Sequence, residues 1–164
     1  MIPLGLGQGG SLLVGHRDTG RTGWICVPCV PLVALQRGPL GRCFRTKPPD
    51  TSSLLSDAKN FLESIWMKDL QRAHQQGLVI TGSTKVREFE PRAFIAILLS
   101  ADAGPSTKKV FEASNSGLET FVINKTSKQL SKQFNSGPRS VVGLMSGRTT
   151  QSLLNTLREG VSLG

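Results

Sequence analysis

Tyrosine is absent from this 164-residue chain, and phenylalanine and tryptophan together make up only 5% of it. Proteins that stack several bases on a sheet need aromatic residues in neighbouring strands, so this composition excludes a wide base-stacking surface. Long apolar runs are also missing, since no stretch approaches the roughly 18 apolar residues of a membrane-spanning helix. Residues 1–15 lack a basic start and are interrupted by glycine, which does not fit a secretory signal. We therefore expect a cytoplasmic protein without a membrane partner.

Acidic residues are scarce. The chain has 20 lysines and arginines against 11 aspartates and glutamates, a formal net charge of +9 and an isoelectric point of about 10.1. Residues 1–47 contain a single acid, Asp18, and no acid occurs between Glu119 and Glu159. Two separate acid-poor basic regions predict surfaces that attract polyanions, and nucleic acids are the commonest polyanions in cells.

Cysteine is rare, with three residues, and an odd number is not typical of a disulfide framework. Cys26 and Cys29 have the spacing of zinc ligands, and Cys43 and His16 are the nearest residues that could complete a site. A redox pair would need to start a helix after a strand in a thioredoxin-like unit, which the short chain before it does not supply. We expect both cysteines to act as small packing residues, and we predict no metal and no cofactor.

The proline pair in Lys47-Pro48-Pro49-Asp50 blocks regular structure and is typical of a linker. It predicts a basic region over residues 1–49 and an α/β domain with its leading helix over residues 50–164. The glycines at 5, 7 and 10 have the spacing of a dinucleotide-binding motif, but residues 11–15 predict a strand where that motif needs a helix. We therefore expect a flexible or turn-forming N-terminus.

Helices and strands alternate from residue 52 onward. The clearest helix is capped by Ser52 or Ser53 and ends near Gly77, and its apolar residues recur every three or four positions, which predicts a buried Trp66. The run at 93–100 carries no charge and is typical of a strand covered on both faces. The other predicted elements are strands at 78–80, 119–124 and 140–145, and helices at 83–90, within 102–117, at 126–137 and at 149–160. This order predicts an α/β fold, a three-layer α/β/α sandwich around a parallel or mixed sheet.

No catalytic constellation is visible. The two histidines lie in different regions, and His74 is expected to face solvent. No serine lies in a nucleophile elbow. Asp102 follows an apolar strand, where we expect it to turn the chain or to cap the next helix. The chain is therefore predicted not to be an enzyme.

Basic residues near predicted helix starts form a better candidate site. Lys108 and Lys109 lie in the first turns of one helix, and Lys125 and Lys128 flank the start of another, where Thr126 and Gln129 fit a capping box. Cations at these positions oppose the helix dipole, so helix stability does not explain them. A bound phosphate would explain them, because free backbone N–H groups and lysine both attract it.

The segment "GRTGWICVPCVPLVALQRGPLGRCFRTK" resembles the second half of a small bacterial α+β RNA-binding domain, the YlxR-like domain. The resemblance rests on Gly20, Arg21, Trp24, Phe44 and Arg45, and it lacks the opening Arg-x-Cys motif, as an N-terminally truncated copy would. It implies a basic RNA-binding surface, on which Arg21 contacts phosphate while Trp24 is expected to be packed.

The second region resembles the kink-turn-binding ribosomal-protein (L-seven-Ae) superfamily. The resemblance rests on four segments in family order, "QQGLVITGSTKV", "AILLSADAGPSTKKV", "FVINKTSKQLSKQF" and "GPRSVVGLMS". It implies an α/β/α sandwich without enzyme activity or cofactor. It also implies RNA contacts from two stretches, Gly82, Ser83, Thr84 and Lys85, and the loop of Gly137, Pro138 and Arg139. The combined arrangement resembles alphaproteobacterial proteins that join both domains.

We therefore expect a non-enzymatic protein that binds structured RNA, such as ribosomal or other ribonucleoprotein RNA. The predicted phosphate contacts are Arg21, Arg42, Arg45 and Lys47 in the first region, and Lys85, Lys108, Lys109 and Arg139 beside the Gly82 turn in the second. Two alternatives stay open. One is a zinc-stabilised module that uses His16, Cys26, Cys29 and Cys43, and the other is an accessory factor that binds ribosome-associated proteins.

Overall fold

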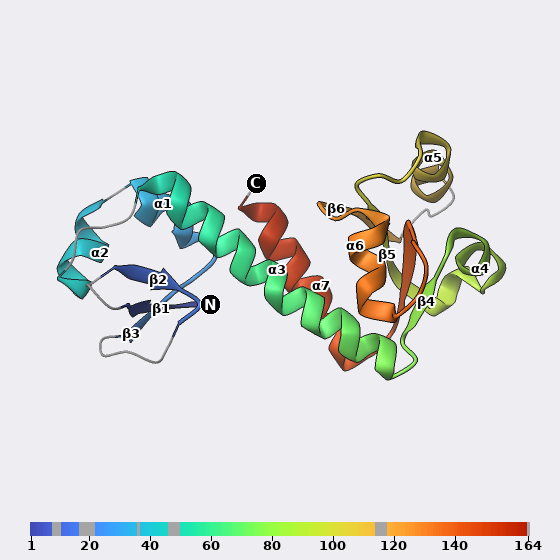
Figure 1. Ribbon diagram of the computed structural model, residues 1–164, viewed down its shortest axis with the longest axis horizontal. Coiled ribbons are helices and arrows are strands. Elements are labelled where there is room, and N and C mark those ends of the chain that lie inside the picture. The colour runs from blue at the N-terminus through green and yellow to red at the C-terminus, as the bar shows by residue number, and fades with distance from the viewer. Residues whose placement is uncertain (8–10, 17–21, 36, 46–49, 114–117, 164) are drawn as a thin grey trace. The chain divides into compact units, whose positions relative to one another are not determined.

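The computed structural model describes residues 1–7, 11–16, 22–35, 37–45, 50–113 and 118–163. The chain forms two compact units, Met1–Ile65 with Asn155–Gly164 and Trp66–Leu154 (Figure 1). The division falls within two helices, α3 (Thr51–Gln75) and α7 (Arg148–Ser162), which contribute residues to both units. The boundary predicted at residues 49 and 50 precedes α3.

The first unit is built on an antiparallel sheet of three strands, β1 (Ile2–Leu6), β2 (Leu12–Val14) and β3 (Thr22–Ile25), in the order β2-β1-β3. The strand predicted at 11–15 is confirmed. The expectation of a turn-forming N-terminus was wrong, because β1 is the central strand. Gly5 allows a close approach of the chain, since a Cβ atom there would lie 2.9 Å from the carbonyl oxygen of His16.

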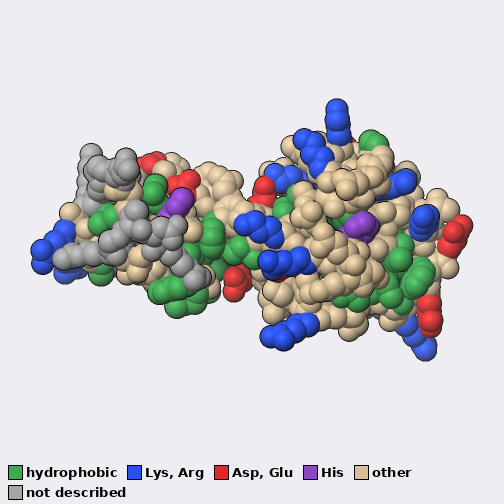
Figure 2. Space-filling model, turned by 60° about the horizontal axis from the view of Figure 1, so that its bottom comes forward, with side chains coloured by type: hydrophobic (Ala, Val, Ile, Leu, Met, Phe, Trp, Pro, Cys, Tyr) green, Lys and Arg blue, Asp and Glu red, His purple; other side chains and the backbone are tan. Residues whose placement is uncertain are grey.

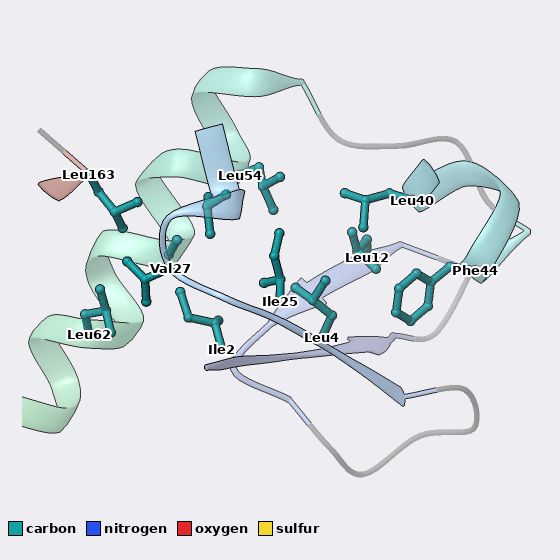
Figure 3. Packing of buried hydrophobic residues seen from close by; sticks show 12 residues of the cluster. Ile2, Leu4, Leu12, Ile25, Val27, Leu40, Phe44, Leu54, Leu62 and Leu163 are labelled. Atoms are coloured by element: carbon teal, nitrogen blue, oxygen red, sulfur yellow. The ribbon is translucent and has the colours of Figure 1, made fainter. Parts of the chain in front are cut away.

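The core of the first unit lies between this sheet and the helices that follow it (Figure 3). Ile2 and Leu4 of β1 belong to one cluster with Leu54 and Leu62 of α3, and all four side chains are buried. Two short helices, α1 (Cys29–Leu35) and α2 (Arg37–Phe44), complete the cluster, to which α2 contributes Leu40 and Phe44. Each fully buried leucine, isoleucine or phenylalanine side chain stabilises the fold by about 1.5–3 kcal/mol, so a hydrophobic core stabilises the basic first region.

Trp24 does not belong to this core. Its side chain is 51% exposed, so the expectation that it is packed was wrong. Successive residues of a strand point to opposite faces, and Ile25 takes the core-facing position at 7% exposure. Trp24 therefore points to the outer face of β3, beside its register partner Pro3 on β1.

The second unit confirms the predicted alternation of helices and strands. Its sheet has the order β4-β7-β5-β6, in which β5 and β6 are parallel and the other pairs are antiparallel. The elements after α3 are β4 (Val79–Thr81), α4 (Ser83–Glu88), β5 (Phe94–Ser100), α5 (Pro105–Ala113), β6 (Glu119–Ile123), α6 (Ser127–Ser131), β7 (Val141–Met145) and α7, with 3-10 turns η2 (Pro91–Ala93) and η3 (Lys132–Phe134).

Helices cover both faces of the four-stranded sheet, as Figure 1 shows. Ile97 and Leu99 of β5 pack with Val86 of α4 and Phe111 of α5 on one face. The alternate residues of β5 and β7 are equally buried and face the layer of α3, α6 and α7. The three-layer α/β/α arrangement predicted for this region is therefore present.

Side-chain contacts join the helices of the second layer. Trp66 of α3 is 6% exposed, as predicted. The Ser152 hydroxyl of α7 donates to the Asp69 carboxylate of α3 at 3.0 Å. The His74 ring lies 5.0 Å from the ring of Phe134. The prediction that His74 faces solvent holds only in part: the residue is half-buried, because the turn η3 after α6 brings Phe134 against the end of α3. Within the described ranges, no helix combines the length and apolarity that a bilayer span requires.

Candidate nucleic-acid interface

The strand order of the second unit brings four separate segments to one edge of the sheet. Because β4 and β5 are both antiparallel to β7, and β6 is parallel to β5, the carboxyl ends of β4, β5 and β6 meet the amino end of β7. The register confirms this alignment, with Leu99 opposite Val141 and Ser100 opposite Ile123. We call residues 82–85, 100–109, 124–128 and 137–140 the carboxyl edge.

Backbone hydrogen bonds join the segments of the carboxyl edge directly. The Gly82 N–H donates to the Val141 carbonyl at 2.9 Å, and the Ser100 N–H donates to the Ser140 carbonyl at 2.9 Å. The Ala101 N–H donates to the Lys125 carbonyl at 2.8 Å. The edge is thus a connected structure, although its parts are distant in the sequence.

Gly82 and Arg139 lie against each other. Gly82 has φ +101°, a conformation that side-chain-bearing residues rarely adopt, and a Cβ atom there would lie 3.8 Å from Cδ of Arg139. The Arg139 backbone N–H donates to the Ser131 hydroxyl at 2.7 Å, which holds the start of its side chain in place. The two stretches predicted to contact RNA are therefore neighbours in space.

Asp102 fastens the β5 end of this edge to α6. Its carboxylate accepts hydrogen bonds from the Ser127 N–H at 2.7 Å and the Ser127 hydroxyl at 2.9 Å. The pKa of Asp102 is lowered first by the Ser100 hydroxyl and then by the Ser127 N–H, because both favour the ionised carboxylate. The Ser100 hydroxyl acts without forming a hydrogen bond of good geometry. The predicted role in turning and capping is correct in kind, but the helix it caps is α6, 25 residues away, and not the next helix.

The predicted capping box at the start of α6 is confirmed. The Thr126 hydroxyl accepts from the Gln129 N–H at 3.2 Å, and the Gln129 side chain accepts from the Thr126 N–H at 2.9 Å. Together with Asp102, this box fixes the segment that carries Lys125 and Lys128.

The carboxyl edge is strongly cationic. Lys85, Lys109 and Arg139 are exposed, and the Lys108 ammonium donates to the Ala101 carbonyl at 3.3 Å. None of these four cations forms an ion pair with a described residue. Figure 2 shows lysine and arginine side chains, in blue, at several places on the surface of the second unit. Asp102 is the single acid in these segments and keeps its negative charge, so the cations of the carboxyl edge leave an excess of positive charge.

The predicted contacts of the first region are only partly described. Arg42 and Arg45 are exposed at the end of α2, whereas Arg21 and Lys47 lie outside the described residues. The end of α2 lies beside β3, because a Cβ atom at Gly23 would lie 3.0 Å from Cζ of Phe44. These cations form a second basic surface on the first unit, near the strand that carries the exposed Trp24.

The cysteine predictions need correction. Cys26 and Cys29 form a disulfide, because the turn between β3 and α1 brings their Cα atoms to 5.2 Å, within the usual disulfide range. The Cys-x-x-Cys spacing could have predicted this disulfide, but the odd number of cysteines argued against any disulfide. Cys43 is a free, exposed thiol. In the part of the chain that is described, no three histidine, cysteine or acidic side chains gather to hold a metal, so His16 and Cys43 do not complete a zinc site.

A cavity between α4 and α5 was not anticipated from the sequence. It has a volume of about 230 Å³ and is lined by Ser83, Arg87, Ser106, Thr107, Val110 and Phe111. Of these residues only Ser83 lies in a stretch that was predicted to contact RNA, so the packing of the two helices is what reveals the cavity.

No protein-family model matches this chain, and no curated protein matches it. Among solved structures, the chain is similar to a protein of unknown function from Bacillus halodurans C, with 21% sequence identity and a TM-score of 0.50. The match covers 57% of this chain and 96% of the other. At this level of identity the similarity shows a shared α/β fold and carries no information on function.

Proposed function

We propose that this protein is a non-enzymatic binder of structured RNA and that the carboxyl edge of the second unit is its main contact surface. The observation that carries the proposal is the convergence of four cations without ion pairs, Lys85, Lys108, Lys109 and Arg139, on one edge of the sheet. Such groups position a protein on phosphates, which dominate nucleic-acid affinity.

The resemblances to the YlxR-like and kink-turn-binding families support the same proposal. The second family implies contacts from the Gly82 turn and from the loop before β7, and these two stretches lie side by side here. Arg42 and Arg45 would add a second, independent contact surface on the first unit.

The test compares RNA binding by two charge-neutralised variants. One carries Lys85, Lys108, Lys109 and Arg139 changed to glutamine. The control carries Arg92→Gln and Arg148→Gln, which lie at the opposite edge of the sheet, beside the start of β5 and the end of β7. With a hairpin RNA that contains an internal loop, we expect the first variant to lose affinity and the control to keep most of it.

Three outcomes would contradict the proposal: no binding of any structured RNA by the wild type, equal losses in both variants, or binding that is insensitive to salt. A protein that binds no isolated RNA but stays on ribosomal particles after nuclease treatment would instead be a protein-binding accessory factor.

A further inference from the structure

The cavity between α4 and α5 has a lining without acidic groups. Ser83 and Arg87 come from α4, and Ser106, Thr107, Val110 and Phe111 come from α5. The polar part consists of three hydroxyls and one guanidinium. Carboxylates, which would repel an anion, are absent from this lining.

A hydrogen bond orients the guanidinium of Arg87 without neutralising its charge. Its Nε donates to the Ser83 carbonyl at 3.3 Å, which restrains the side chain beside the cavity. Arg87 forms no ion pair with a described residue. The hydroxyls of Ser83, Ser106 and Thr107 donate no hydrogen bond to a described residue. Guanidinium groups only donate hydrogen bonds and match phosphate oxygens in pairs, and hydroxyls can add further donors.

The rest of the lining is apolar. Phe111 is 4% exposed and belongs to the core, while Val110 is 38% exposed and offers its side chain to a bound molecule. An inorganic anion alone would leave this surface unused. At about 230 Å³ the cavity is smaller than the roughly 300–1,000 Å³ of drug-sized sites, so it suits a small ligand.

We propose that this cavity binds the phosphate monoester of a small organic molecule. Arg87 and the hydroxyls hold the phosphate, and the carbon part of the ligand lies against Val110. The cavity adjoins the carboxyl edge, which shares Ser83, Ser106 and Thr107 with it. The site still goes beyond the proposed RNA-binding function, because none of the four cations that carry that function lines it. The phosphate can belong to a free metabolite-sized ester or to the 5′ end of an RNA strand.

Calorimetric titration of the full chain tests the proposal. The probes are ribose 5-phosphate and adenosine 5′-monophosphate, each against its unphosphorylated parent, and inorganic phosphate alone. We expect the esters to bind, the parents not to bind, and inorganic phosphate to bind more weakly than the esters. A short RNA with a 5′-phosphate, compared with its 5′-hydroxyl counterpart, decides whether strand ends are also accepted.

Arg87→Gln should weaken ester binding at least tenfold, whereas Arg92→Gln, an exposed arginine outside the cavity, should leave it unchanged. Arg87→Lys should fall between the two, and thermal unfolding of each variant shows whether it is folded. The proposal is overturned if no ester binds at millimolar concentration, if esters and parents bind equally, or if folded Arg87→Gln binds like the wild type.

The two proposals fail separately. The variant with Lys85, Lys108, Lys109 and Arg139 replaced should still bind esters, and Arg87→Gln should still bind structured RNA. Loss of ester binding in the first variant would assign the phosphate to the carboxyl edge and contradict the cavity as the site.

Discussion

The charge of the carboxyl edge predicts a specific dependence of RNA binding on salt. Each cation that neutralises one phosphate contributes about 0.7–0.9 to the slope of log affinity against log salt concentration, because counterions are released from the RNA. If Lys85, Lys108, Lys109 and Arg139 each contact one phosphate, their joint contribution is about 3. A fourfold rise in salt, from about 50 to about 200 mM, then lowers the affinity by about 60-fold through these residues alone.

Fluorescence anisotropy of a labelled RNA hairpin, recorded over a series of potassium chloride concentrations, measures this slope. Arg139→Gln should reduce the slope by about 0.8, and the fourfold variant should reduce it by about 3. Arg92→Gln and Arg148→Gln, at the opposite edge, should each change it by much less. A fourfold variant with the wild-type slope would refute the assignment of phosphate contacts to this edge, even if RNA binding itself persists.

Three further predictions concern the supports of these surfaces. Gly82→Ala should destabilise the protein by about 1–3 kcal/mol in urea unfolding, because of its positive φ, whereas Gly137→Ala, with open space around its Cα, should have little effect. The lowered pKa of Asp102 adds stability above the ordinary value of 3.8, and this stability is lost as the pH falls through the folded-state pKa; Asp102→Asn should remove that acid-dependent part of the unfolding curve. Reduction of the Cys26–Cys29 disulfide opens a four-residue loop and, in the chain-entropy account, lowers the free energy of unfolding by about 2 kcal/mol. Cys43→Ser should leave this response to reductant unchanged.

The alternation of the second unit could be predicted because its signals are local. Apolar spacing along α3, the uncharged run of β5 and the capping box at Thr126 each act within a few residues. The strand β1 was missed for the opposite reason. Its glycines suggest turns when read locally, and only pairing with β2 and β3 shows that they allow a close approach of neighbouring chain segments.

The candidate site could be predicted as residues but not as a surface. Lys108, Lys109 and Arg139 stand out in the sequence near loops and helix starts. Their convergence depends on the insertion of β7 between β4 and β5, which is a long-range pairing that no local pattern encodes. Trp24 shows the same limit, since the face to which it points depends on the register of β3 with β1. The cavity of α4 and α5 depends on how two helices pack and left no trace in the sequence.

The core of the first unit has a consequence for the order of events during synthesis. Its cluster joins Ile2, in the first strand, to Leu163, after the end of α7. Residues 66–154 form the second unit as one continuous stretch, so that unit has all of its chain before residues 155–163 leave the ribosome. The first region emerges earliest yet must wait for the last turn of α7 before its core is complete. A chain that ends at residue 154 would therefore contain the whole second unit, while its N-terminal sheet lacks Leu163 and is open to proteases.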